Sequence, residues 1–356
     1  MPPQLAGARV SAEPTLLEVE DLVVRYPIHR GLVGSATRQP RRNVHAVEGV
    51  SLSLRRGEML ALVGESGCGK TTTAQAVLRL VDPVSGSIRF EGRDLVELGP
   101  RELRPLRRRI QVVYQDPYES LDPRFRVRAA VEEPLLIHRL GGSKPERAAR
   151  VRDALVRVGL SPPELYLDRY PHELSGGQRQ RVAIAAALAL EPDVLVADEP
   201  VSMLDVSVRA GVLNVLDGLR EQGLAILMIT HDLSTAARFA QRIAVMYLGR
   251  IVEEGPAESV VRNPQHPYTK ALLSVVPRRD PRDRRRPQIL KGETPDAVAI
   301  PSGCRFHPRC PVAVERCAVE DPALVRPAGV DEGHRAACLL LPPAAPPSPN
   351  LRSSAA

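Results

Sequence analysis

The sequence predicts an α/β fold in which the strands of a parallel sheet alternate with helices. Two short apolar runs, PDVLVADEP at 192–200 and LAILMITHDL at 224–233, indicate strands that are buried on both faces, as in parallel sheets. A third observation is segment 59–80, where an apolar run leads into a glycine-rich turn and then a helical stretch. With 356 residues, the chain is long enough for two or three domains.

The other elements of the ordered core follow from the same patterns. Alternating apolar and polar residues predict a strand at 15–25, and a Gly/Pro/Arg-rich loop is expected at 30–43. Segment 46–63 predicts two further strands, and 109–117 predicts another. From about 120 to 175 the pattern is helical and interrupted by proline, so a group of helices is expected there.

Beyond residue 260, periodicity fades and Pro and Arg become frequent, which predicts a separate extension at 261–342. The stretch HPYTKALL, from His266, is expected to form an amphipathic helix that packs the extension on the core through Tyr268, Leu272 and Val275. The last residues, 343–356, are expected to be disordered.

Composition narrows the functional classes. The net charge of +7 comes mainly from arginine, and no basic run is interleaved with aromatics, so we interpret the charge as compositional bias and expect no nucleic-acid partner. The N-terminus lacks the apolar segment of a secretory signal, and the longest apolar run, at 182–190, is too short to span a membrane. A cytosolic location is therefore expected, where clustered cysteines are more often metal ligands than disulfides.

The stretch GESGCGKT at 64–71 matches the pattern G-x-x-x-x-G-K-[ST] between an apolar run and a helix. Such a loop wraps backbone N–H groups around phosphate oxygens, and the positive end of the helix adds to the attraction. Lys70, one of only four lysines, can reach the β- and γ-phosphates of a nucleotide, and the Thr71 hydroxyl can bind Mg²⁺. The predicted nucleotide-binding residues here are Gly64, Glu65, Ser66, Gly67, Cys68, Gly69, Lys70, Thr71 and Thr72.

Two acidic residues end the strand predicted at 192–200. Asp198 can hold Mg²⁺, and Glu199 is placed to orient or deprotonate an attacking water. Adjacent acids after a buried strand can also cap a helix, but next to a phosphate-binding loop the catalytic interpretation is favoured.

The stretch LSGGQRQR at 174–181 resembles the signature motif of ABC-transporter ATPases, and four further motifs of that family follow the expected order. Tyr26 resembles the aromatic that stacks on adenine, Gln115 the Q-loop glutamine that contacts Mg²⁺, SMLD at 202–205 the D-loop, and His231 the switch histidine. The D-loop has Met203 where alanine is commoner and retains Asp205. Tyr26, Gln115 and His231 also have plain structural interpretations as a strand aromatic, a loop amide and a strand-end histidine.

The resemblance covers about residues 15–260 and implies an ABC ATPase domain with a P-loop core, an antiparallel β subdomain and a helical subdomain at about 120–178. In that family two such domains pack head to tail, and each ATP lies between one phosphate loop and the signature of the other domain. The resemblance therefore implies that Ser175, Gly176, Gly177 and Gln178 contact nucleotide in trans. It also implies that Glu199, His231 and Gln115 act in catalysis, and that Asp205 lies at the nucleotide.

Three features resemble the ATPases of dipeptide/oligopeptide importers, more specifically the second of their two paired ATPase subunits. They are a long loop after Tyr26, the stretch at 114–124, and the segment 263–277 with the cysteine tail behind it. The implied partners are two membrane-spanning permease subunits, a paralogous ATPase or a second copy, and indirectly a substrate-binding protein, at the cytoplasmic face of the membrane. Nickel or sugar-type importers share these features, and a non-transport ABC ATPase acting on nucleic acid is a further alternative.

Four of the five cysteines lie in the extension, spaced Cys304-x5-Cys310-x6-Cys317-x20-Cys338. Four thiolates can complete the coordination of a metal centre. Zinc sites usually contain C-x₂₋₄-C pairs, which are absent here, and the tail resembles those of importer ATPases in which a [4Fe–4S] cluster is implied. We therefore expect such a cluster, with Zn²⁺ or reduced structural cysteines as alternatives and His307 and His334 as candidate substitute ligands.

Overall fold

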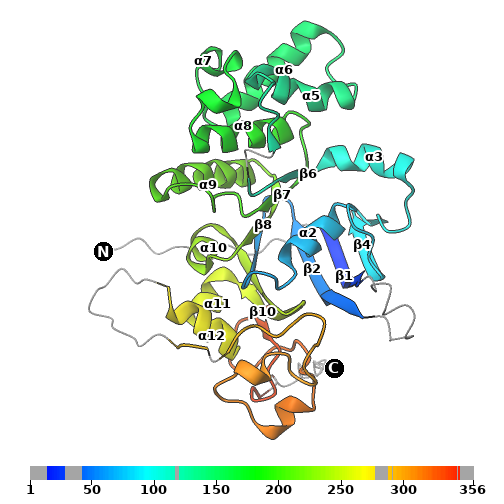
Figure 1. The fold of residues 1–356 in the computed structure, drawn as a ribbon, viewed down its shortest axis with the longest axis vertical. Helices are drawn as coiled ribbons and strands as arrows, with labels where there is room; N and C mark the ends of the chain where they lie inside the picture. Colours follow the sequence, from blue (N-terminus) through cyan, green and yellow to red (C-terminus); the bar gives the residue numbers. More distant parts are fainter. Residues whose placement is uncertain are drawn as a thin grey trace, which may run out of the picture.

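The computed structural model describes residues 14–28, 42–116, 120–276, 288–290, 292–342 and 344. In this part of the chain, three regions follow one another along the longest axis of the molecule (Figure 1). A group of helices lies at one end, two sheets lie in the middle, and an irregular extension lies at the other end. Most of the loop predicted at 30–43 and of the tail predicted at 343–356 lies outside the described residues.

The centre of the molecule is a seven-stranded sheet in the order β11-β10-β9-β3-β8-β7-β6. β3 (Met59–Val63) runs parallel to β8 (Ala225–Thr230) and β9 (Arg242–Tyr247), while β7 (Val194–Asp198) runs parallel to β8 and to β6 (Ile110–Val113). Every residue of β3, β7 and β8 is buried. The parallel sheet predicted from the apolar runs is confirmed, because strands covered on both faces need apolar side chains throughout.

Helices connect the parallel strands, and the sheet ends in an antiparallel edge. The connections include α2 (Lys70–Val77) after β3, α9 (Val206–Glu221) between β7 and β8, and α10 (Leu233–Phe239) between β8 and β9. β10 (Arg250–Pro256) pairs antiparallel with β9, and β11 (Arg335–Ala336), a strand of the extension, pairs antiparallel with β10. The extension thus adds its own strand to the sheet of the core.

A second, antiparallel sheet has the order β2-β1-β4-β5. Its strands are β1 (Thr15–Pro27), β2 (Asn43–Arg55), β4 (Ser85–Phe90) and β5 (Arg93–Asp94). The strand predicted at 15–25 is confirmed, whereas the strand predicted from residue 46 already begins at Asn43. The strand predicted at 109–117 is shorter than expected, because α3 (Pro100–Arg109) continues to Arg109 and β6 covers only Ile110–Val113.

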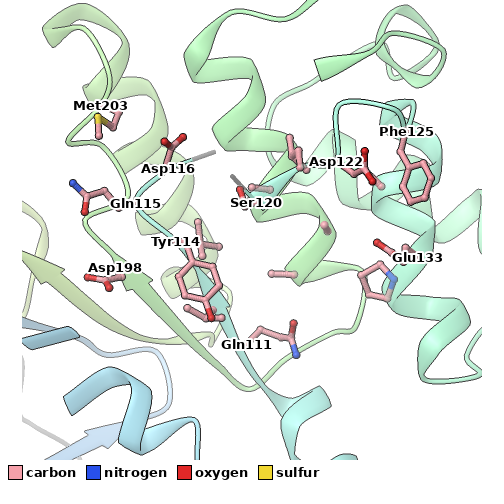
Figure 2. Close-up of a pocket in the computed structure, with 18 of the residues that line it drawn as sticks. Gln111, Tyr114, Gln115, Asp116, Ser120, Asp122, Phe125, Glu133, Asp198 and Met203 are labelled. Atoms are coloured by element: carbon pink, nitrogen blue, oxygen red, sulfur yellow. The ribbon is translucent and has the colours of Figure 1, made fainter. Parts of the chain in front are cut away.

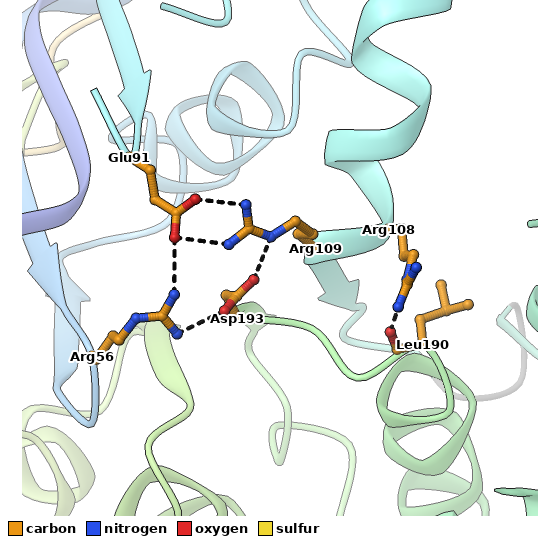
Figure 3. A network of polar contacts seen from close by, with 6 residues as sticks. All are labelled: Arg56, Glu91, Arg108, Arg109, Leu190 and Asp193. Carbon is orange, nitrogen blue, oxygen red and sulfur yellow. Dashed lines mark hydrogen bonds and ion pairs between the residues drawn. The ribbon is translucent and has the colours of Figure 1, made fainter. Parts of the chain in front are cut away.

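A network of charged side chains joins the two sheets (Figure 3). Arg56 follows β2 and Glu91 lies between β4 and β5, whereas Arg109 and Asp193 directly precede β6 and β7. Each arginine binds both carboxylates: Arg56 at 2.7 Å to Asp193 and 3.0 Å to Glu91, Arg109 at 2.6 Å to each. The Arg109 hydrogen bonds, helped by Arg56, hold the pKa of Glu91 below its usual value. Opposite charges alternate around this ring, so it fixes the two sheets relative to each other.

The predicted helical region forms an arm at one end of the molecule (Figure 1). Its helices are α5 (Val127–Ile137), α6 (Lys144–Arg157), α7 (Glu164–Leu167) and α8 (Gly176–Leu188). Val131, Leu155 and Ile184, on three of these helices, are fully buried and belong to one hydrophobic cluster. α8 therefore connects the arm with the core.

The extension is irregular, as predicted, and packs closely on the core. α11 (Ala257–Arg262) leads into it, and its first helix is α12 (Pro267–Ser274), the helix expected from HPYTKALL. Tyr268 is fully buried and Leu272 packs against the main hydrophobic cluster, but the predicted contact of Val275 is wrong. Val275 is 60% exposed, because α12 ends at Ser274 and Val275 lies just past it, outside the face that packs on the core.

Candidate functional site

The phosphate-binding loop connects the buried strand β3 with α2. Gly69 has φ +106°, and a side chain there would bring its Cβ within 2.1 Å of the Ala46 carbonyl oxygen, so only glycine fits. Lys70 is 5% exposed, and its Nζ donates to the carbonyl oxygens of Gly64 and Glu65, each at 2.9 Å. The predicted loop is therefore curled around the lysine ammonium, with α2 beginning at Lys70 itself.

Other residues of this loop have distinct surroundings. Cys68 is buried, its Sγ lies 3.7 Å from Lys70 Nζ, and burial raises the pKa of its thiol. Ser66 and Gly67 are exposed, and Thr72 is half-buried at the start of α2. The structure thus presents the tip of the loop to solvent and buries its base.

The three predicted magnesium ligands line one cavity. Thr71, Gln115 and Asp198 are among the walls of a cavity of about 810 Å³ between the core and the helical arm. Figure 2 shows Gln115, Asp198 and Met203 on one side of it, with Asp122 and Phe125 of the arm opposite. Thr71 Oγ1 donates to Asp198 Oδ1 at 3.4 Å. Gln115 and Asp198 follow Thr71 by 44 and 127 positions, and the shared edge of β3, β6 and β7 brings the three residues together.

The chemistry of this donor set suits Mg²⁺. Asp198 is 7% exposed, and burial, with the neighbouring Glu199 charge, raises its pKa against the opposing effects of Thr71 and Lys70. A cation beside the carboxylate would offset the energetic cost of burying its negative charge. Magnesium is commonly bound by one or two carboxylates together with substrate phosphates, and one carboxylate, one hydroxyl and one amide fit that pattern.

Glu199 and His231 form a pair next to this site. His231 Nδ1 lies 3.1 Å from Glu199 Oε2, and both side chains line a small cavity with Ser202 and Asp232. Glu199 has φ +45°, which is unusual for a residue with a side chain and is typical of strained functional positions. Its backbone N–H donates to Ile229 O at 2.9 Å, which holds Glu199, just past the end of β7, beside the neighbouring strand β8.

The predicted signature turn opens α8. Ser175 Oγ accepts from the Gln178 N–H at 3.3 Å, and Gln178 Oε1 accepts from the Ser175 N–H at 3.0 Å. This reciprocal capping satisfies two donors at the start of the helix. Ser175 is exposed and Gly177 is buried, with Val208 of α9 packed where a side chain of Gly177 would be. None of these turn residues lines the described cavity that holds Thr71 and Asp198.

Two predicted contacts lie apart from that cavity as well. Tyr26 lies near the end of β1, opposite Val44 of β2, and is 36% exposed. Asp205 is the N-cap residue of α9. Their assigned contacts with nucleotide stay predictions.

Glu65 has partners that the sequence did not reveal. Its carboxylate binds Arg309 at 2.8 Å and accepts a hydrogen bond from Thr294 Oγ1 at 2.6 Å, and its backbone N–H donates to the Tyr268 hydroxyl at 3.0 Å. Burial acts to raise the pKa of Glu65, but the hydrogen bonds from Arg309 and Thr294 outweigh it and lower the pKa. All three partners belong to the extension, and no spacing or motif links them to the loop.

The four tail cysteines are neighbours, and none forms a disulfide. The pKa of Cys304 is raised to about 11, first by burial and further by the other three tail thiols. The Cys304 N–H donates to Cys317 O at 2.8 Å. In the described part of the chain, however, no group of three or more His, Cys, Asp or Glu side chains is arranged to hold a metal ion. This arrangement supports neither Zn²⁺ nor a [4Fe–4S] cluster, and both stay predictions.

His307 and His334 are not ligands in this arrangement. His307 Nδ1 bonds the Cys304 carbonyl at 2.9 Å, and the buried His334 places Nε2 2.8 Å from Glu253. Their predicted role as substitute ligands has no support in the described geometry.

The ABC transporter family matches residues 47–202, and the family described as the C-terminal region of oligopeptide/dipeptide transporters matches residues 252–317. The chain belongs to the ATP-binding proteins of the ABC transporter family and is an ABC-type ATPase.

Among particular relatives, a probable peptide ABC transporter ATP-binding protein of Sinorhizobium fredii is 47% identical over 331 residues, covering 93% of this chain and 91% of that protein. The dipeptide transport ATP-binding protein DppF of Escherichia coli is 47% identical over 296 residues, covering 83% of this chain and 86% of DppF.

Solved structures agree with this assignment. A dimer of the ATP-binding cassette MJ0796, in a post-hydrolysis state bound to ADP and Pi, has a TM-score of 0.58 and 29% identity, covering 68% of this chain and 98% of that one. The cbiO1 protein of Clostridium perfringens, part of an ABC transporter complex, has a TM-score of 0.60 and 30% identity, covering 70% and 92%. No helix among the described residues is long and apolar enough to cross a membrane.

Proposed function

We propose that this chain hydrolyses Mg-ATP to power the import of dipeptides or oligopeptides through two membrane-spanning permease subunits. It would act at the cytoplasmic face of the membrane, paired head to tail with a paralogous ATPase or a second copy. A substrate-binding protein would deliver the substrate to the permeases and so be an indirect partner of this chain. The observation that carries the ATPase role is the convergence of Thr71, Gln115 and Asp198 on one cavity beside the phosphate loop. The peptide substrate is supported by the C-terminal region and by the names of the relatives.

The side chains have separate roles in this proposal. The loop at 64–72 holds the phosphates through backbone N–H groups and Lys70, while Thr71, Gln115 and Asp198 would hold Mg²⁺. The cation would supply charge neutralisation on the phosphates. Glu199 accepts a proton from the attacking water, and the 3.1 Å contact with His231 Nδ1 orients its carboxylate.

The signature turn supports the head-to-tail arrangement. Ser175 is exposed and begins a 13-residue helix, so the positive end of α8 is available to an anion outside this chain. In this arrangement Ser175, Gly176, Gly177 and Gln178 contact the γ-phosphate bound by the partner, and ATP holds the dimer closed. Hydrolysis removes the shared ligand and lets the dimer open.

The Glu199→Gln variant tests the catalytic role. We expect it to bind Mg-ATP normally, to lose hydrolysis by about 100-fold or more, and to accumulate as a closed dimer in ATP during size-exclusion chromatography. Glu221→Gln, at an exposed position at the end of α9, is the matched control and should behave as wild type. Turnover of Glu199→Gln at the control rate would show that Glu199 is not the base.

The substrate is tested with the complete transporter in vesicles. Import of a labelled dipeptide that depends on ATP supports the proposal, whereas import of Ni²⁺ or another small solute without peptide import assigns the same ATPase to a different transporter. Purification with nucleic acid and without permease subunits would favour the non-transport alternative.

We further propose a [4Fe–4S] cluster held by Cys304, Cys310, Cys317 and Cys338. Support comes from the gathering of four reduced thiols around one another, since a cubane cluster is larger than a single ion and is held by four cysteines. Protein purified without oxygen should contain about four iron and four sulfide ions per chain. Protein without either would leave the cysteines with a structural role.

A further inference from the structure

The extension contacts the phosphate-binding loop directly, at one residue. Arg309 donates to both carboxylate oxygens of Glu65, at 2.8 Å and 3.3 Å, and Thr294 Oγ1 donates to the same carboxylate at 2.6 Å. The Glu65 N–H donates to the Tyr268 hydroxyl at 3.0 Å. We call Arg309, Thr294 and Tyr268 together with Glu65 the loop clasp. It occupies both the side chain and the backbone N–H of a residue inside the loop.

The clasp is largely shielded from solvent. The Arg309 side chain is 9% exposed and that of Glu65 is 28% exposed. The guanidinium lies 6.0 Å from the centre of the Tyr247 ring, and Phe306, three residues before Arg309, packs edge-on against Tyr247 at 5.2 Å. An ion pair held in one geometry by buried rings, with two hydrogen bonds to one carboxylate, constrains its partner far more than a pair on the surface.

On its inner side, Glu65 is tied to the residue that would contact phosphate. The Glu65 carbonyl oxygen accepts a hydrogen bond from Lys70 Nζ at 2.9 Å. Contacts therefore run from Arg309 through Glu65 to Lys70. A shift of Glu65 would change the position of the carbonyl to which the lysine ammonium is bound.

We propose that Arg309 is a positioning residue for ATP binding, which holds the phosphate-binding loop in shape through Glu65. This inference rests on the proposed role of the loop in binding ATP. It makes the extension a part of the nucleotide site, in addition to any role of its cysteines. Because Arg309 lies directly before Cys310, the clasp and the cysteine tail share one short segment of chain.

The test compares Arg309→Ala with Arg316→Ala in the full chain. Arg316 is in the same extension and makes an exposed ion pair with Glu320, away from the loop, so it is the matched control. We expect Arg309→Ala to raise the Kd for Mg-ATP, and the KM, by about tenfold with a smaller change in kcat. Arg316→Ala should leave both constants unchanged. Equal constants for the two variants would overturn the proposal.

A double-mutant cycle separates positioning from general loss of stability. Glu65→Ala, Arg309→Ala and the double variant are compared for Kd, and the clasp predicts that the double variant binds no more weakly than the weaker single one. Independent, additive losses would contradict a clasp. If Arg309→Ala does not fold, Arg309→Gln takes its place in the same cycle, because it keeps most of the side chain.

Lys70→Ala distinguishes failure of the clasp from failure of the loop assignment. Wild-type binding by Lys70→Ala would refute the nucleotide site itself. Loss of binding by Lys70→Ala, together with equal Kd values for Arg309→Ala and Arg316→Ala, would refute only the clasp.

Discussion

Two turns made of small residues open helices in this protein, and they are held in opposite ways. The phosphate-binding loop before α2 has a buried base, is curled around Lys70, and is held at Glu65 by the extension. The signature turn before α8 has an exposed Ser175, which is capped by reciprocal hydrogen bonds with Gln178, while Gly177 behind it packs against Val208 of α9. Both turns suit anions, but the first has a residue held by the extension, whereas the second leaves its capping Ser175 exposed.

The difference indicates a division of labour. A turn that is shaped by neighbours on several sides is pre-organised to bind its ligand without help from a partner. A turn that is stable by itself and exposed can be presented to a second molecule without rearrangement. The comparison thus supports a complete binding site at the phosphate loop and a half-site at the signature turn.

The largest expected difference between the two turns is in Mg-ATP binding, which a change in the phosphate-binding loop should abolish and a change in the signature turn should not. Lys70→Ala should abolish Mg-ATP binding by the isolated chain, because the loop loses its only ammonium. Ser175→Arg should leave that binding near wild type, since Ser175 does not line the described cavity that holds Thr71 and Asp198, and should block hydrolysis. Fluorescent-nucleotide titration beside an ATPase assay measures both. Loss of binding by Ser175→Arg would contradict the comparison.

A smaller effect is expected from adding one methyl group to each turn. In Gly69→Ala the new Cβ would lie 2.1 Å from Ala46 O at φ +106°, so the free energy of unfolding should fall by roughly 2–4 kcal/mol.

In Gly176→Ala, the matched change, the nearest atom is the end of the Leu204 side chain at 3.2 Å. The free energy of unfolding should change by less than about 1 kcal/mol. Urea denaturation gives both values, and equal losses would show that the two turns are equally constrained.

The smallest effect concerns the cap of α8. Ser175→Ala removes one capping hydrogen bond and should lower the free energy of unfolding by about 1 kcal/mol. Ser143→Ala is a matched control, because Ser143 caps α6 through the same reciprocal arrangement with Glu146. Both variants should lose similar stability, but only Ser175→Ala should also slow ATP hydrolysis. Equal rates of ATP hydrolysis by Ser175→Ala and Ser143→Ala would show that Ser175 acts only as a helix cap.

Much of this architecture could be predicted from local sequence. The apolar runs that became β7 and β8, and the loop between β3 and α2, carry their signals within ten residues. Thr71 could be assigned from the phosphate-loop pattern and Asp198 from the acidic end of a buried strand, whereas Gln115 was implied by the resemblance to ABC-transporter ATPases. The sheet then brings those strand ends to one edge.

The loop clasp could not be predicted in the same way. Arg309 and Glu65 are 244 residues apart, and Arg309 lies in an irregular segment without periodicity. Nothing distinguishes it from the many other arginines of the chain before the packing of Phe306 and Tyr247 is known. The failed contact of Val275 has a similar cause, because a helical pattern does not show where the helix ends.

The central claim is that the phosphate loop and the signature turn form one site only when they come from two chains. The most direct test mixes Lys70→Ala with Ser175→Arg, in a preparation in which the unmodified chain hydrolyses ATP by itself. Each variant alone should be inactive, whereas a mixed dimer contains one intact loop opposite one intact turn and should recover hydrolysis. A mixture that stays inactive although mixed dimers form would contradict the account.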